Sequence, residues 1–154
     1  MKQYLLDTFR YNDWANRQVL AKILELSEPQ ESIRLFSHLI NSQNKWLARI
    51  NGDKNELQLS WFEPLYSLDE LAAQWNASLA QWFDFLEPLS ETDLEREVPY
   101  IAADGNSYSS RLREIALQLN FHSIHHRAQI SLLVRKQGLE PPFIDYIGTT
   151  RRKQ

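Results

Sequence analysis

The chain has 154 residues, 43% of them hydrophobic and 24% charged, which is typical of one globular domain spanning residues 1–154. A net charge of −3 argues against a nucleic-acid partner, and no run approaches the roughly 20 apolar residues of a membrane span. The absence of cysteine excludes disulfides and thiolate metal ligands and fits a reducing compartment, so we expect a cytoplasmic protein without a membrane partner.

The first helix is predicted over residues 2–26, because apolar side chains recur on one side at about 100° per residue. Asn12 and Asn16 lie in the centre of this apolar stripe. A buried amide is costly unless it is hydrogen-bonded, so the pair indicates either a polar pocket or side-chain bonds that only fix the helix register.

A second helix is predicted from a capping box at Ser27-Glu28-Pro29-Gln30 to about Ile50, where Asn51-Gly52-Asp53 ends it. His38 lies at the edge of its apolar face, one turn from Ser42. From this position a histidine can reach inward, but it can equally face water.

Residues 53–66 are expected to form an irregular connection in which Trp61 and Phe62 pack over another part of the chain. A third helix then follows from a second capping box, Ser67-Leu68-Asp69-Glu70. Between Ser90 and Ser109, a turn signal at Ala103-Asp104-Gly105-Asn106 separates two short extended segments. We therefore expect a small hairpin or a pair of extended arms that covers one end of the helices.

The fourth helix, from about Ser110 to Gln137, contains three of the four histidines. His122 and His126 are four residues apart in its apolar stripe, so they point the same way with the spacing that one metal ion can bridge. Arg127 sits at the edge of this stripe, where it either approaches the pocket or forms a surface ion pair. A second apolar stripe on the opposite side predicts burial there too, either by other parts of the chain or by a second subunit, and we favour a homodimer. It consists of Leu117, Phe121, Ile124, Ala128 and Leu132.

These elements predict an all-α protein, a helical bundle with a short extended or hairpin segment before the last long helix. Residues 143–147 are expected to fold back over the bundle.

Two neutral imidazoles in an apolar stripe need partners for their nitrogens, and a divalent cation supplies one while linking helices. A third imidazole from His38 would complete a facial set that leaves positions open for water or substrate, as catalytic zinc sites do. Three imidazoles suit zinc, nickel, iron(II) or copper, of which zinc or nickel is preferred here. Because Ser123 follows His122 where a zincin has glutamate, a base for hydrolysis must come from elsewhere.

The pattern around these histidines resembles the DinB family, damage-inducible four-helix proteins that include metalloenzymes. The residues that carry the resemblance are His122-x3-His126-Arg127-x-Gln129, Tyr11-Asn12-Asp13-Trp14-Ala15-Asn16, His38-x7-Trp46-Leu47-x-Arg49 and Gly138-Leu139-Glu140-Pro141-Pro142. They span nearly the whole chain, and Ala128, where members often have glycine, is a minor departure. The resemblance implies an up-down four-helix bundle, often dimeric. Members hold a divalent metal with one histidine from the second helix and two from the fourth, which implies His38, His122 and His126 as ligands.

Characterised relatives include metal-dependent transferases and isomerases that use low-molecular-weight thiols such as bacillithiol or mycothiol. The resemblance therefore implies an enzyme acting on a small-molecule substrate, with Asn12, Asn16, Ser42 or Arg127 near the pocket. A metal-dependent hydrolase and a non-catalytic metal-binding module of the stress response are the alternatives. No role follows for His125.

Overall fold

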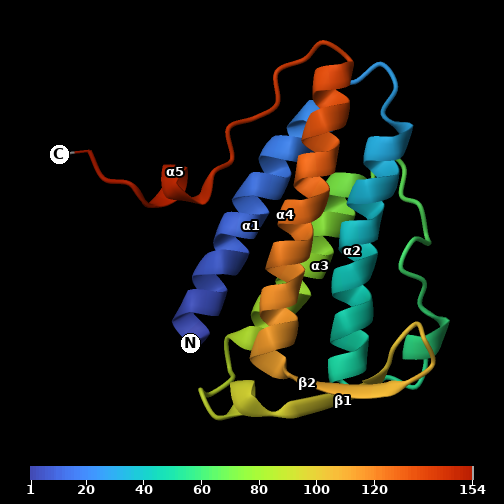
Figure 1. Ribbon diagram of the computed structural model, residues 1–154, viewed down its shortest axis with the longest axis vertical. Helices are drawn as coiled ribbons and strands as arrows, with labels where there is room; N and C mark the ends of the chain where they lie inside the picture. The colour runs from blue at the N-terminus through green and yellow to red at the C-terminus, as the bar shows by residue number, and fades with distance from the viewer. Residues whose placement is uncertain (154) are drawn as a thin grey trace.

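The computed structural model describes residues 1–153 as a mostly helical protein with a small two-stranded sheet (Figure 1). Its four long helices, which lie side by side, are α1 (Lys2–Ile23), α2 (Gln30–Ile50), α3 (Leu71–Leu86) and α4 (Leu112–Lys136). The strands β1 (Glu97–Ile101) and β2 (Ser107–Arg111) form a hairpin, and the short helix α5 (Tyr146–Thr150) lies near the C-terminus. Within residues 1–153, no helix combines the length and the apolar character needed to cross a membrane.

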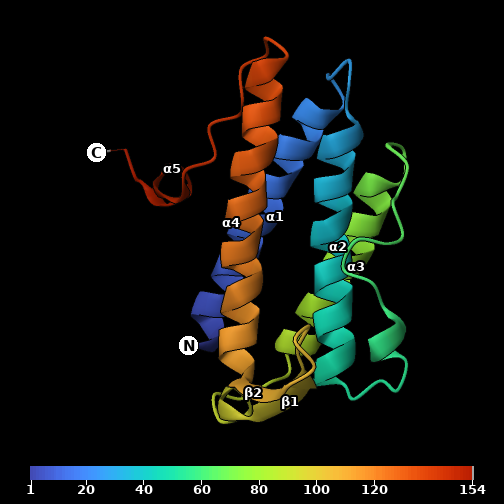
Figure 2. The same cartoon turned by 45° about the vertical axis from the view of Figure 1, so that its right-hand side comes forward.

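Helices α2 and α3 run in the same direction, which differs from the alternating order expected of an up-down bundle (Figure 2). The chain between them travels back along α2, because the outer side of that helix offers polar side chains to its backbone. The ammonium of Lys45 donates to the carbonyl of Leu59, and the hydroxyl of Ser37 then accepts the N–H of Tyr66 at 3.2 Å. The local sequence pattern located the helices, but the up-down order implied by the family resemblance is wrong for α3.

The start of α2 also differs from the expected capping box. The helix begins at Gln30 without a side-chain cap, and the Ser27 hydroxyl instead donates to the side-chain oxygen of Gln137 at 3.1 Å. The same Gln137 oxygen accepts the backbone N–H of Glu28 at 3.0 Å. The side-chain amide of Gln137, just after α4, thus accepts hydrogen bonds from both Ser27 and Glu28. This tertiary contact takes the place of the expected local cap.

The second capping box is partly formed. The Glu70 carboxylate accepts both the backbone N–H and the hydroxyl of Ser67, at 2.8 and 2.7 Å, as the sequence predicts. The helix itself begins one residue after Glu70, at Leu71.

Two tryptophans of α3 form the centre of the core. Trp75 and Trp82 are fully buried, and their rings pack against Phe36 of α2 and Phe9 of α1, with centroids 5.7 and 5.5 Å apart. Each indole nitrogen has a partner, since Trp75 donates to the Asp13 carboxylate and Trp82 to a backbone carbonyl of α2. Large apolar area is thus buried without leaving an indole N–H unsatisfied, which fixes α3 against α1 and α2.

The expected hairpin is present and closes the end of the molecule where α2 ends and α4 begins (Figure 1). Its strands are antiparallel, with Tyr100 opposite Tyr108, and Gly105 adopts a φ of 79° in the turn, a left-handed conformation that suits glycine. Tyr100 packs on Trp46 of α2 at 5.0 Å, so the hairpin forms one wall of the groove between α2 and α4.

The C-terminal segment folds back only as far as α1. The Tyr11 hydroxyl donates to the carbonyl of Ile144 at 2.7 Å, and the Tyr146 ring lies 5.1 Å from that of Tyr11. Beyond this contact the segment projects away from the helices, and Phe143 and Ile147 remain largely exposed (Figures 1 and 2). The expectation that residues 143–147 cover the helices is therefore met only around Ile144 and Tyr146.

The second apolar stripe of α4 is not buried by this chain. Phe121, Ile124 and Leu132 are 59, 47 and 53% exposed. The remaining members, Leu117 and Ala128, are not buried either. This set of five residues is called the α4 stripe below.

Candidate metal centre

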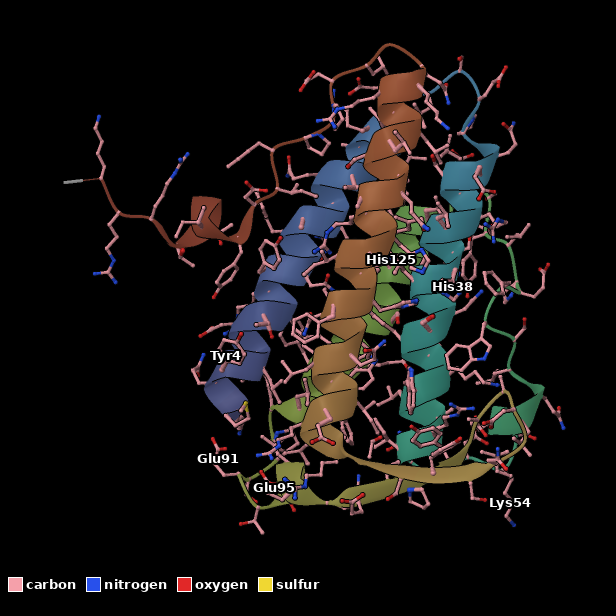
Figure 3. The ribbon with its side chains drawn as sticks, in the orientation of Figure 1. Tyr4, His38, Lys54, Glu91, Glu95 and His125 are labelled. Carbon is pink, nitrogen blue, oxygen red and sulfur yellow. The ribbon has the colours of Figure 1, made fainter. Side chains whose placement is uncertain are left out.

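Helices α2 and α4 bring three histidines together across the groove between them. His38 comes from α2, while His122 and His126 come from successive turns of α4. Figure 3 shows His38 and the neighbouring His125 at similar heights on the two facing helices. The Nε2 atom of His122 lies 3.1 Å from that of His38 and 2.9 Å from that of His126. The three ligand nitrogens lie within 4.8 Å of one another.

The separations between these nitrogens fit a common metal ion. Nitrogen ligands roughly 2.0–2.1 Å from an ion lie about 3.0 Å apart at right angles and about 3.4 Å apart at tetrahedral angles. The distances of 2.9 and 3.1 Å from the Nε2 of His122 are close to the right-angle value. Three protein ligands would leave further coordination positions of such an ion open.

The outward nitrogens of two of the rings fix which tautomer each adopts. The Nδ1 of His38 lies 2.7 Å from the carbonyl of Trp61, and the Nδ1 of His126 lies 2.7 Å from the side-chain oxygen of Gln129. Both acceptors require a proton on Nδ1, so both Nε2 atoms carry a lone pair toward the centre. If His122 carried its proton on Nε2, that proton could not form a good hydrogen bond with both of the other Nε2 atoms. A cation, by contrast, could be bound by the lone pairs of all three imidazoles.

Burial keeps the three imidazoles neutral at pH 7. It lowers the pKa of His122 to about 4, with a further lowering from the neighbouring His126 and His38. Burial also lowers the pKa of His38 and of His126, although the hydrogen bonds to Trp61 and Gln129 act in the opposite direction. A neutral imidazole is the form that ligates a metal.

The connection between α2 and α3 covers His38 and holds its ring. Phe62 stacks on the imidazole, with centroids 4.4 Å apart and an angle of 13° between the planes. His38 is 7% exposed, so the alternative in which it faces water is wrong. The stacking and the hydrogen bond to Trp61 together orient its Nε2 toward α4.

Comparison with known protein families matches residues 1–154, the whole chain, to the DinB family. The chain belongs to the DinB family. No curated protein matches it significantly. Family membership and the three-histidine group are both compatible with metal binding.

A cavity of about 220 Å³ opens beside the histidines of this DinB chain, with His38 and His122 in its wall. Ser42 also lines it, and within residues 1–153 its buried hydroxyl has no hydrogen-bond partner. Trp46 and Gln118 line both this cavity and a neighbouring one of about 400 Å³ that extends to the hairpin. The two cavities therefore lie next to each other along the groove.

The other three candidates lie elsewhere in the structure. Arg127 donates through Nη1 to the side-chain oxygens of Asn12 and Asn16, at 2.5 and 3.4 Å, between α1 and α4. Asn16 also donates to Asn12 at 3.2 Å. None of these three residues lines the cavity beside His38. Arg127 follows His126 directly, but successive helix residues lie about 100° apart, so its side chain points toward α1. Arg127 is only 2% exposed, so the alternative of a surface ion pair is wrong.

Two neighbours of the histidines were not identified from the sequence. The partner of His38 is a backbone carbonyl, which carries no residue-type signal. Gln129, by contrast, lies three residues after His126 and therefore on the same helix face, so its spacing could have suggested the contact. The exposed His125 lies outside the group of three, with its Nε2 3.3 Å from the amide nitrogen of Gln129.

Proposed function

We propose that this DinB protein binds one zinc or nickel ion through His38, His122 and His126 and transfers a low-molecular-weight thiol to a small electrophilic substrate. The observation that carries the proposal is the convergence of three Nε2 atoms, two of them held as lone-pair donors by bonds at Nδ1. Three protein ligands leave coordination positions free for a reactant, which distinguishes a catalytic site from a closed structural one.

When bound, such an ion supplies Lewis acidity, which favours the thiolate form of a thiol. The residues of the chain then position the reactants. The Ser42 hydroxyl is free to donate to a ligand beside His38 and His122, because it has no partner among residues 1–153. Trp46 and Trp61 form apolar walls of the same cavity.

The hydrolase alternative has less support, because activating water needs a general base within reach. Within residues 1–153, the wall of the cavity beside His38 and His122 includes no aspartate or glutamate. Glu114 lines the adjoining cavity, but its carboxylate already accepts the backbone N–H of Arg111 at 3.1 Å. Thiol transfer requires no such base when the thiol reacts as the thiolate.

Metal binding can be tested before any reaction is known. Purified protein should contain about one divalent ion per chain, as expected of a single three-ligand site. His122→Ala should lose it, whereas His125→Ala, which alters a neighbouring exposed imidazole, should retain it. Undiminished metal in His122→Ala by elemental analysis would exclude this residue as a ligand.

The reaction is tested by incubating the metal-loaded protein with bacillithiol, mycothiol or glutathione and a panel of aryl halides and epoxides. We expect thioether formation in the wild type and in His125→Ala, and none in His38→Ala. Ester or amide hydrolysis without thiol would support the hydrolase instead. Binding of a thiol without turnover would support the non-catalytic module.

We also propose that two copies of the chain associate through the α4 stripe. Three large apolar side chains in one row are exposed there, and contiguous apolar patches of this kind mark interaction surfaces. Phe121→Glu should convert a dimer to a monomer in sedimentation equilibrium, while Leu57→Glu, at an exposed apolar residue outside the stripe, should not. A monomeric wild type would overturn this part of the proposal.

A further inference from the structure

Arg127 carries a buried charge that the structure does not neutralise. Its Nη1 donates to the side-chain oxygens of Asn12 and Asn16, whereas its Nη2 is buried without a hydrogen-bond partner. Within residues 1–153, no salt bridge joins its guanidinium to a carboxylate. An ionised group that is withdrawn from water without an opposite charge is unfavourable, so an anionic partner would stabilise it.

The same arginine lines a cavity large enough for a small molecule. The cavity has a volume of about 390 Å³ and lies between α1, α4 and the segment of residues 140–145. Small-molecule sites typically have volumes of about 300–1,000 Å³. This cavity shares no lining residue with the one beside His38 and His122, so it is a separate site.

We propose that this cavity binds an organic monocarboxylate with an apolar body, whose carboxylate pairs with the guanidinium of Arg127. An arginine guanidinium matches a carboxylate in geometry and forms strong charge-assisted bonds with it. Ile124, Phe143 and Ile144 line the cavity and provide contacts for the apolar part of the ligand. The inference is independent of the metal centre and of thiol transfer.

The charges around the cavity favour a monoanion over a phosphate ester. Arg127 and Arg135 line it together with Glu140 and Asp145, so these four side chains sum to zero charge. A dianionic phosphate would bring two negative charges close to the carboxylates of Glu140 and Asp145. A monocarboxylate brings a single negative charge, which is enough to pair with the guanidinium of Arg127.

Tyr11 connects Arg127 to the wall of the cavity that residues 140–145 form. Its ring centroid lies 5.4 Å from the guanidinium carbon, and its hydroxyl donates to the carbonyl of Ile144 at 2.7 Å. Because Nη2 is shielded from solvent, a carboxylate can reach it only if part of this wall shifts. Phe143 in this wall is 60% exposed, so few packing contacts of its side chain oppose such a shift.

The test uses 4-fluorobenzoate as the probe, observed by fluorine NMR with the full-length protein. We expect saturable line broadening at millimolar probe, reversed by benzoate, and weaker broadening of 4-fluorobenzyl alcohol, which has the same ring without the charge. Stronger competition by inorganic phosphate than by benzoate would overturn the monocarboxylate assignment. Failure of the probe to broaden at all would overturn the site.

Variants distinguish this cavity from the metal centre, where a carboxylate could also bind. Arg127→Met should weaken 4-fluorobenzoate at least about tenfold, the loss of one charge-assisted interaction. Ser131→Phe fills the cavity and leaves the hydrogen bonds of Arg127 intact, so it should also weaken binding of 4-fluorobenzoate. This variant tests the site even if Arg127→Met fails to fold. Ser131→Ala is the matched control and should bind the probe like the wild type. His122→Ala should bind the probe normally. Loss of binding in His122→Ala with retention in Ser131→Phe would place the probe at the histidines and overturn the proposal.

Discussion

The Nδ1 of His38 lies 2.7 Å from the carbonyl oxygen of Trp61, a residue that belongs to no helix or strand. This contact determines which nitrogen of His38 carries the proton and therefore directs the Nε2 lone pair toward α4. The geometry of the histidine centre thus depends on where an irregular segment lies. That segment is held by Lys45, whose buried ammonium donates to the carbonyls of Glu56 and Leu59.

Removing the ammonium of Lys45, which holds this segment in place, should weaken metal binding although no metal ligand is changed. Lys45→Met keeps the side-chain length but loses both hydrogen bonds, so we expect metal affinity to fall about tenfold, as for the loss of other groups that orient metal ligands. Lys54→Met, at an exposed lysine of the same connection, should leave affinity unchanged. Competition with a chromogenic chelator measures both, and equal affinities would show that the position of Trp61 does not depend on Lys45.

Gln129 should act on the metal through His126. Gln129→Leu removes the acceptor for Nδ1 and frees the ring to rotate, so affinity should fall about 10–100-fold. Gln129→Glu supplies a stronger acceptor and should preserve or increase affinity. The control is His125→Ala, which removes the other contact of Gln129. A larger effect of His125→Ala than of Gln129→Leu, in the same chelator titration, would contradict this role.

The metal-free protein should lose stability as the pH falls below about 6.5, the ordinary pKa of an unfolded histidine. Burial lowers the pKa of His122 to about 4 in the folded chain, so between these values the unfolded chain binds more protons than the folded one. The free energy of unfolding therefore decreases as pH falls through this window. His122→Asn should show a shallower decrease in urea titrations with chelator present, and an identical slope would refute the linkage.

Trp75 should contribute strongly to the stability of the core. Trp75→Ala would empty a fully buried site beside Phe36 and leave Asp13 without its indole donor. We expect the free energy of unfolding to fall by about 3–5 kcal/mol. Leu57→Ala, at a residue 65% exposed, should change it by less than about 0.5 kcal/mol. Urea denaturation of the two variants makes the comparison, and similar midpoints would place Trp75 outside the folding core.

Local sequence patterns located the long helices and the hairpin well. The first helix was expected to end near residue 26 and ends at Ile23, and the fourth was expected over residues 110–137 and spans Leu112–Lys136. Gly138, with a φ of 80°, ends α4 as its position in the sequence predicted. These features depend on interactions between residues close together in the chain, so their signals are present in short windows.

Features that depend on distant contacts were predicted less well. Ser27 was expected to cap α2 but bonds to Gln137, about 110 residues away, because the end of α4 lies beside it. Likewise, α3 was expected to reverse the direction of α2 and does not, because the polar side of α2 binds the returning connection. In both places a tertiary contact satisfied groups that local bonds would otherwise have satisfied.

The sequence by itself determined that His122 and His126 share one face of a helix, since a spacing of four residues fixes this wherever the helix lies. Only the tertiary structure decided that His38 meets them and that Arg127, beside His126 in sequence, faces α1 and a different cavity. The distance between side chains on different helices is set by how those helices pack and by the segment that connects them. No local pattern contains this information, because it arises only when the whole core is assembled.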